Sequence, residues 1–330
     1  MDQDTKPSFI NDERGVAPLI GFILLFAIGV VAFSGYQAVQ VPQQNAATEF
    51  QHSQDVQNDL IDVRSSISTA GQADASQFPT VRLGTDYTTR ILALNPPSAT
   101  GTLQTSDAYP IIIENEDGDS EEVDTRFLQY QPGYNELNSR PIWYENSVLY
   151  VDAREDGGVA ILEDQNLVVD DDTLRITALQ NEFQESGTGR ITLELYPTQN
   201  VTADDIPEGD LTVTLPTRLG PGEYWEEAID LDVSVINDGT YEDDDEYEVY
   251  TLTLENIDTT EGGELKLNTV GIQSKPSEGG QKQNVGTGGG GDSGTELPGT
   301  LTAEVTNLGQ GEVTMTYDGA EAVDVTAEAN

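Results

Sequence analysis

The sequence predicts an α+β protein with a long N-terminal transmembrane and stalk helix, a mainly antiparallel, sandwich-like β domain and a short C-terminal β segment. Three observations lead to this prediction. No charged residue interrupts the chain from Gly15 to Tyr36, an amphipathic helical pattern follows, and the rest consists of short apolar segments separated by turn residues. Because a helix rises about 1.5 Å per residue, about 20 apolar residues cross the hydrocarbon core of a bilayer. The predicted membrane span is residues 16–36.

Residues 37–70 are predicted to continue as an amphipathic stalk helix. Pro42 predicts a kink or a short break near its start. Apolar residues then recur mainly at three- and four-residue intervals, which places them on one helical face: Phe50, Val56, Leu60, Val63 and Ile67. This stripe must pack on the β domain or on neighbouring subunits. Ala70-Gly71 is the expected end of the helix.

The remainder of the chain shows the two-residue periodicity of β-strands. Short strand candidates lie between residues 80 and 272, bounded by Gly, Asn, Asp and Pro. They lack helical spacers, which favours an antiparallel arrangement over an α/β fold. A glycine-rich linker and three further strand candidates follow. The predicted divisions are a leader at 1–15, the span at 16–36, the stalk at 37–70, a β-rich ectodomain at 71–275, the linker at 276–298 and the C-terminal β segment at 299–330.

The composition is strongly acidic. The chain has 14 Lys and Arg against 60 Asp and Glu, a net charge of −46, and the acidic residues are spread along its length. Such a surface repels itself at low ionic strength. In molar salt the Debye length falls to about 3 Å, which screens that repulsion. The composition therefore predicts a high-salt environment, and it argues against nucleic-acid binding, for which a basic face is expected.

The absence of cysteine and the positions of Lys and Arg limit the kinds of scaffold and the membrane orientation that the chain can have. The chain has no cysteine, which excludes a disulfide scaffold and a cysteine-based metal site. Lys6 and Arg14 precede the apolar run, and the next basic residue is Arg64. Because Lys and Arg near a span stay on the cytoplasmic side, we expect a single-pass protein of the cell membrane. Its N-terminus would be cytoplasmic and its C-terminal domain extracellular.

Three interpretations of the apolar run compete. A cleaved secretory signal has a shorter apolar stretch of about 7–15 residues, so cleavage after the run is not favoured. A plain membrane anchor is the second interpretation. The third is a class III, or prepilin-type, signal, which is cut on the cytoplasmic side before the apolar run and leaves that run at the mature N-terminus.

The third interpretation has residue-level support. The opening Asp12-Glu13-Arg14-Gly15-Val16-Ala17-Pro18-Leu19-Ile20-Gly21 resembles the N-termini of haloarchaeal type IV pilin-like membrane proteins. That resemblance implies processing between Gly15 and Val16 by a prepilin peptidase. Ala17 stands where the family usually has serine, and Ile20 stands where bacterial pilins have glutamate. Segments between residues 110 and 230, among them Phe127–Pro132, also resemble the globular domain of such proteins.

The sequence therefore predicts a pilin-like structural subunit or minor pilin of an archaeal surface filament. Its expected partners are membrane lipid, a prepilin peptidase and other pilin subunits contacted through the N-terminal helix. A permanently anchored extracellular binding or adhesion domain that does not polymerise is the first alternative. An anchored surface hydrolase is the second, but the sequence offers no nucleophile–base pair, so no catalytic residue, cofactor or metal is predicted.

Few other residues are candidates for a site. Asn200 opens the sequon Asn200-Val201-Thr202 and is a possible glycosylation site. The single histidine, His52, is expected to face solvent on the stalk. The acidic runs are expected to be solvated loops, and the serine motif Gly291–Gly294 is expected to be linker. The aromatic residues are expected to pack in the core: Trp143, Tyr144, Tyr224 and Trp225.

Overall fold

The computed structural model describes most of the chain and divides it into two units, Met1–Gly286 and Thr287–Asn330. The described residues are 16–90, 93–138, 140–154, 157–170, 173–198, 206–229, 231–244, 247–260, 264–273, 299–307 and 312–319. The predicted leader, the glycine-rich linker and Asn200 lie outside these residues.

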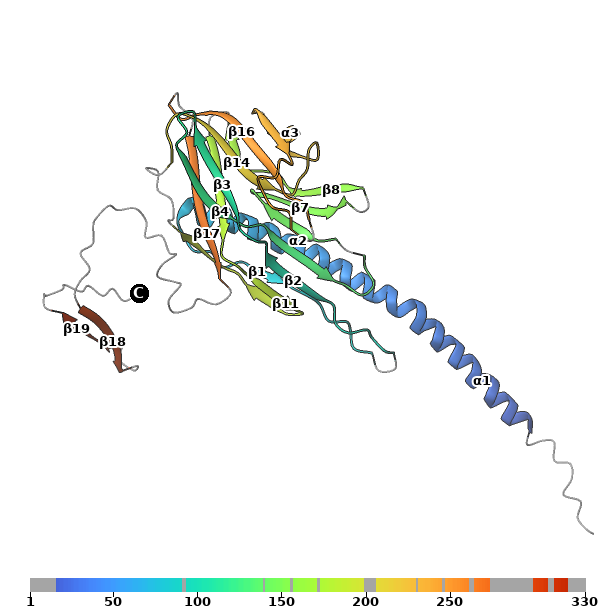
Figure 1. Cartoon of the computed structure of the whole chain (residues 1–330). Coiled ribbons are helices and arrows are strands. Elements are labelled where there is room, and N and C mark those ends of the chain that lie inside the picture. The colour runs from blue at the N-terminus through green and yellow to red at the C-terminus, as the bar shows by residue number, and fades with distance from the viewer. Residues whose placement is uncertain are drawn as a thin grey trace, which may run out of the picture. The chain divides into compact units, whose positions relative to one another are not determined.

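The first unit begins with one long helix (Figure 1). It consists of α1 (Val16–Gly35), a π-helical turn η2 (Tyr36–Gln40) and α2 (Val41–Ala73). The helix runs on through Pro42 without the predicted short break. Proline has no N–H to donate, and the adjoining turn is widened instead, with the N–H of Val41 donating to the carbonyl of Tyr36. Such π turns accommodate a local irregularity within a continuous helix.

The helix ends three residues later than expected, at Ala73. Asp74 follows in the left-handed conformation with φ of 50°, which is a common way to terminate a helix. Aspartate tolerates this conformation better than most residues. Gly71 is therefore inside the last turn, where a Cβ would lie only 3.0 Å from the side chains of Asn268 and Thr177. Close packing on the sheet accounts for glycine at this position.

The β domain that follows is mainly antiparallel, as predicted. Of the strand pairs that the structure describes, the parallel one joins β10 (Thr173–Gln180) to β17 (Glu264–Gln273). These two strands are completed into a four-stranded sheet by β13 (Glu194–Thr198) and β9 (Val168–Asp170). A separate pair joins β1 (Thr80–Arg82) to β12 (Arg190–Thr192).

Two larger sheets complete the domain. The six-stranded sheet has the order β11 (Gln184–Gly187), β2 (Thr100–Thr105), β5 (Leu128–Gly133), β6 (Ile142–Glu145), β7 (Val148–Ala153) and β8 (Gly158–Glu163). The five-stranded sheet has the order β15 (Val233–Ile236), β16 (Tyr250–Asp258), β14 (Asp210–Thr217), β3 (Tyr109–Asn115) and β4 (Ser120–Thr125). The short helix α3 (Trp225–Ala228) follows β14.

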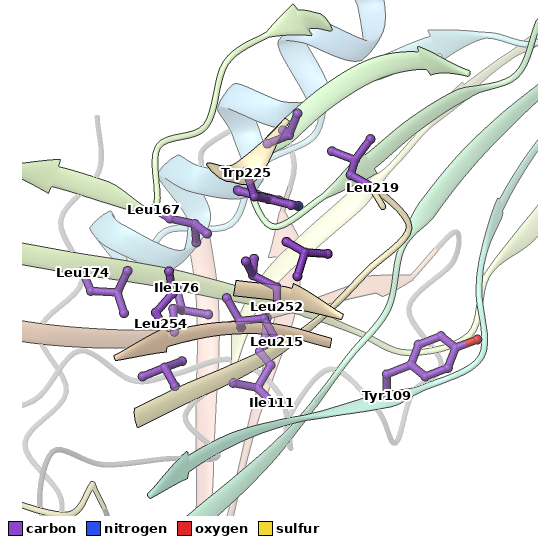
Figure 2. Packing of buried hydrophobic residues seen from close by; sticks show 14 of the residues in the cluster. Tyr109, Ile111, Leu167, Leu174, Ile176, Leu215, Leu219, Trp225, Leu252 and Leu254 are labelled. Atoms are coloured by element: carbon purple, nitrogen blue, oxygen red, sulfur yellow. The ribbon is translucent and has the colours of Figure 1, made fainter. Parts of the chain in front are cut away.

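Two hydrophobic cores lie on opposite faces of shared strands. On β6, Trp143 belongs to one core and Tyr144 to the other, because successive side chains of a strand point to opposite faces. The first core contains most of the apolar residues of the five-stranded sheet, and Figure 2 shows Ile111, Leu215 and Leu252 lying next to one another there. The second core contains five residues of α2: Val56, Leu60, Val63, Ile67 and Ala70.

The second unit contains an antiparallel pair, β18 (Gly299–Asn307) and β19 (Glu312–Gly319). These strands coincide with the first two strand candidates of the predicted C-terminal segment. The third candidate, residues 322–326, lies outside the described residues.

Candidate functional site

The first half of the N-terminal helix is an uncovered apolar surface. Every residue from Pro18 to Tyr36 is exposed, and the exposed fraction reaches 72% at Leu25 and Val31. A Cβ added at Gly21, Gly29 or Gly35 would meet no atom within 4 Å. The helix is long and apolar enough to cross a membrane. Exposed apolar area of this extent is unfavourable in water, so lipid or other helices must cover it.

The second half of the same helix is covered along one face. The buried side chains of α2 recur at three- and four-residue intervals: Val41, Asn45, Glu49, His52, Val56, Leu60, Val63, Ile67 and Ala70. The predicted stripe therefore packs on the chain's own β domain, with one correction. Phe50 is 55% exposed. It follows the buried Glu49 in the sequence, so its side chain points about 100° away from the buried face around the helix axis.

The buried face has a polar part next to the apolar segment and an apolar part farther on. In the polar part, His52 is 6% exposed, which contradicts the expected solvent-facing position. Its Nδ1 lies 2.7 Å from the Tyr134 hydroxyl. Burial lowers the pKa of His52 from its ordinary 6.5, since desolvation disfavours the charged form. The helical period was detected in the sequence from apolar residues alone. The polar residues that share the same face, such as His52, did not contribute to that pattern and were therefore missed.

Glu49 is the central residue of this polar contact. Its side chain is fully buried and accepts hydrogen bonds from three successive backbone N–H groups: Asn135 at 2.8 Å, Glu136 at 3.0 Å and Leu137 at 2.7 Å. The Tyr87 hydroxyl donates a further bond. Burial raises the pKa of Tyr87 to about 12. One carboxylate thereby joins the helix to two separate loops of the β domain.

A second set of polar contacts lies closer to the apolar segment. The Arg90 guanidinium donates to Asn45 Oδ1 at 3.1 Å and to Gln44 Oε1 at 2.9 Å. The Gln37 side-chain amide pairs with the backbone of Leu94, accepting from its N–H at 3.1 Å and donating to its carbonyl at 2.8 Å. The segment between β1 and β2 is thus attached to the helix where the apolar run ends.

The β domain also contains a buried charge cluster that the sequence analysis missed. Glu145 is 1% exposed and Arg218 is 3% exposed. Glu145 accepts from the backbone N–H of Arg218 at 3.0 Å and from the Thr217 hydroxyl at 2.6 Å. The Arg218 guanidinium donates to Asp152 Oδ2 at 3.0 Å and lies 3.6 Å from the ring centroid of Trp143. The cluster joins β6 and β7 to the end of β14.

Asp152 gives folding stability a pH dependence of defined sign. Burial alone would raise its pKa, but its hydrogen bond to Arg154 and the charges of Arg154 and Arg218 outweigh burial and lower the pKa from 3.8 to about 2. A depressed folded-state pKa stabilises the fold above pH 3.8, and this contribution disappears as the pH falls through about 2. The shift corresponds to about 2 kcal/mol.

We therefore expect the stability difference between the wild type and Asp152→Asn to shrink on acidification. The measurement is the free energy of unfolding from pH 5 to pH 2 at constant high salt. Burial raises the pKa of Glu145, which changes stability with the opposite sign but is common to both proteins. A difference that stays constant over this range would contradict the prediction.

The other candidates are not assembled into a catalytic or metal site within the described residues. No group of three or more His, Asp or Glu side chains there is arranged to hold a metal ion. A cavity of about 500 Å³ is lined in part by Asp107, Asp243 and Asp244. Asp243 Oδ1 accepts from the N–H of Val249 at 2.8 Å, so this carboxylate has a structural role in the chain before β16. His52 lies elsewhere, on α2.

The aromatic candidates lie within the described residues, whereas most of the processing and modification candidates do not. Trp143, Tyr144 and Trp225 are buried and Tyr224 is partly buried against the first core, as expected for packing residues. Val16 is the first residue of α1, while Gly15 and the Gly291–Gly294 motif lie outside the described residues. Asn200 lies there too, so its glycosylation stays a prediction.

Comparison of the chain with protein family models, with curated proteins and with solved structures finds no match. No family membership follows, and the function has to be inferred from the residues and their geometry.

Proposed function

We propose that this chain is a pilin-like structural subunit, or minor pilin, of an archaeal surface filament, held in the membrane by its N-terminal helix before assembly. One observation carries the proposal. A single continuous helix is apolar and uncovered from Pro18 to Tyr36 and is buried along one face from Val41 to Ala70. The first half is free to contact lipid or neighbouring helices, while the second half holds a folded domain.

The N-terminal residues support this proposal over a plain anchor. Cleavage between Gly15 and Val16 would place the new N-terminus at the first residue of α1. Pro18 then lies in the first helical turn, where a missing N–H costs nothing. Lys6 and Arg14 before the span support a cytoplasmic leader, accessible to a prepilin peptidase, and the acidic composition supports an extracellular, sandwich-like β domain in a high-salt medium.

Sequencing the N-terminus of the mature protein tests this proposal. We expect the mature chain to begin at Val16. The variant Gly15→Val should keep its leader, because the added side chain alters the cleavage position. Gly21→Ala is the matched control and should be processed normally, since a Cβ there meets no atom within 4 Å. An intact Met1, or a start beyond residue 36, would overturn the proposal.

Shearing the cells distinguishes the filament subunit from the permanently anchored alternative. A filament subunit is expected in the sheared fraction as well as in the membrane. A protein that begins at Val16 but stays wholly in the membrane fraction would support an anchored binding or adhesion domain instead.

A further inference from the structure

Leu94 is the most exposed large apolar side chain that the structure describes. Its exposed fraction is 82%, against 72% for the most exposed residues of α1. It lies in the β domain, in the segment between β1 and β2, where few large apolar side chains are exposed. A single exposed leucine is common in soluble domains, so the position of Leu94 in the fold is more informative than its exposure.

That position is fixed by Gln37. The amide oxygen of Gln37 accepts from the Leu94 N–H at 3.1 Å, and its amide nitrogen donates to the Leu94 carbonyl at 2.8 Å. Gln37 belongs to η2, which directly follows α1. The paired bonds therefore hold the Leu94 backbone at the level where the apolar run ends. Figure 1 shows the segment between β1 and β2 extending beside the helix in the direction of α1.

The composition of this segment is unlike that of the rest of the chain. Within the segment between β1 and β2, residues 87–99 contain no Asp or Glu, although the whole chain has 60 of them, and they include one cation, Arg90; Asp86, near the start of the segment, is its one acid. Arg90 is held against α2 by Gln44 and Asn45. A carboxylate at this level would be repelled by anionic headgroups and would cost free energy to desolvate. An acid-free stretch beside the end of the apolar run fits a lipid surface.

We propose that Leu94 is a second membrane contact, inserted into the interfacial region of the bilayer beside the N-terminal helix. This inference rests on the membrane anchoring in the proposed function. The bilayer boundary is marked independently by Tyr36, which is 41% exposed at the end of the apolar run, where aromatic residues commonly lie at the interface. Because the β domain is already packed on α2, a second contact would restrict the tilt of the molecule relative to the bilayer.

The test measures how deeply a reporter at Leu94 lies in the bilayer. The full chain is placed in lipid vesicles, Leu94→Trp is introduced, and tryptophan emission is quenched by lipids brominated on their acyl chains. The native Trp143 and Trp225 are 3% and 0% exposed, and the wild type provides their background. We expect a blue shift of the new emission and at least a twofold loss of its intensity.

Phe78→Trp is the matched control. Phe78 is 56% exposed and follows the far end of α2, whose 33 residues span about 50 Å. Its emission should keep the wavelength of a water-exposed tryptophan and should not be quenched. In the Leu94→Trp background, Gln37→Ala should reduce the quenching, because the paired bonds to the Leu94 backbone are lost. Unchanged quenching would show that Gln37 does not position this residue.

Failure of the inference is distinguishable from failure of the membrane anchor. If the chain does not float with vesicles, the proposed anchoring is wrong. If it floats but the Leu94→Trp emission stays water-like and unquenched, the anchor stands and the second contact is overturned. That second result would favour a neighbouring subunit, in place of lipid, as the contact of Leu94.

Discussion

Replacement of Arg218 by methionine is expected to destabilise the β domain by about 3–5 kcal/mol. The guanidinium is 3% exposed, is paired with Asp152 at 3.0 Å and covers the Trp143 ring at 3.6 Å. Methionine fills a similar volume but carries no charge. Asp152 would keep Arg154 as a cationic partner but lose Arg218, and the buried Glu145 would lose the favourable charge of Arg218. A buried carboxylate that loses charge compensation is strongly unfavourable.

Chemical denaturation of the full chain in detergent measures this effect. Arg190→Met is the matched control, since Arg190 is exposed on β12 and a surface change of this kind costs less than about 0.5 kcal/mol. Because buried pairs are screened little by salt, the loss at Arg218 should persist from low to molar salt. A loss below about 1 kcal/mol, or one that vanishes in high salt, would mean that the cluster is not a buried electrostatic contact.

Replacement of Glu49 by leucine is expected to cost about 3 kcal/mol or more, and to act mainly on the loops that contact the helix. The carboxylate accepts hydrogen bonds from the N–H groups of Asn135, Glu136 and Leu137 and from the Tyr87 hydroxyl. A buried donor left without an acceptor costs about 1–3 kcal/mol. Some of these donors will reach water when the loop loosens, which limits the total.

Hydrogen exchange localises this effect. The amides of residues 135–137 should exchange about 100-fold faster in Glu49→Leu, since about 2.7 kcal/mol corresponds to that factor. Glu49→Gln keeps one carbonyl acceptor and should lie between the wild type and the leucine variant. Glu136→Gln, at an exposed position on the same loop, should leave exchange and stability unchanged. Equal exchange in Glu49→Leu and the wild type would contradict the assigned role of the carboxylate.

Much of the helix was predictable from local pattern. An uncharged run long enough to cross a bilayer and a three- to four-residue apolar period are properties of neighbouring residues, so Val56, Leu60, Val63 and Ile67 were correctly placed on one face. Phe50 was placed wrongly, because it was assigned by its hydrophobicity. The period that the structure follows at that level passes through Glu49, a residue type that is seldom buried without partners.

The candidate site was less predictable, because its polar members meet across long stretches of chain. Glu49 is buried only because a loop more than 80 residues away turns three N–H groups toward it. Arg218 is buried only because β14 ends beside β6 and β7. No local periodicity marks either residue, and in a chain with 60 acidic side chains one more carboxylate carries no signal.

The sequence by itself determined the class of this protein: an N-terminal helix with an uncovered apolar half, a mainly antiparallel β domain and a strongly acidic composition. These are matters of spacing and charge along the chain. Only the tertiary structure decided which face of the helix is covered, which carboxylates are buried, and that Leu94 lies level with the end of the apolar run. Each of these depends on contacts between segments that are distant in the sequence, and only the fold brings those segments together.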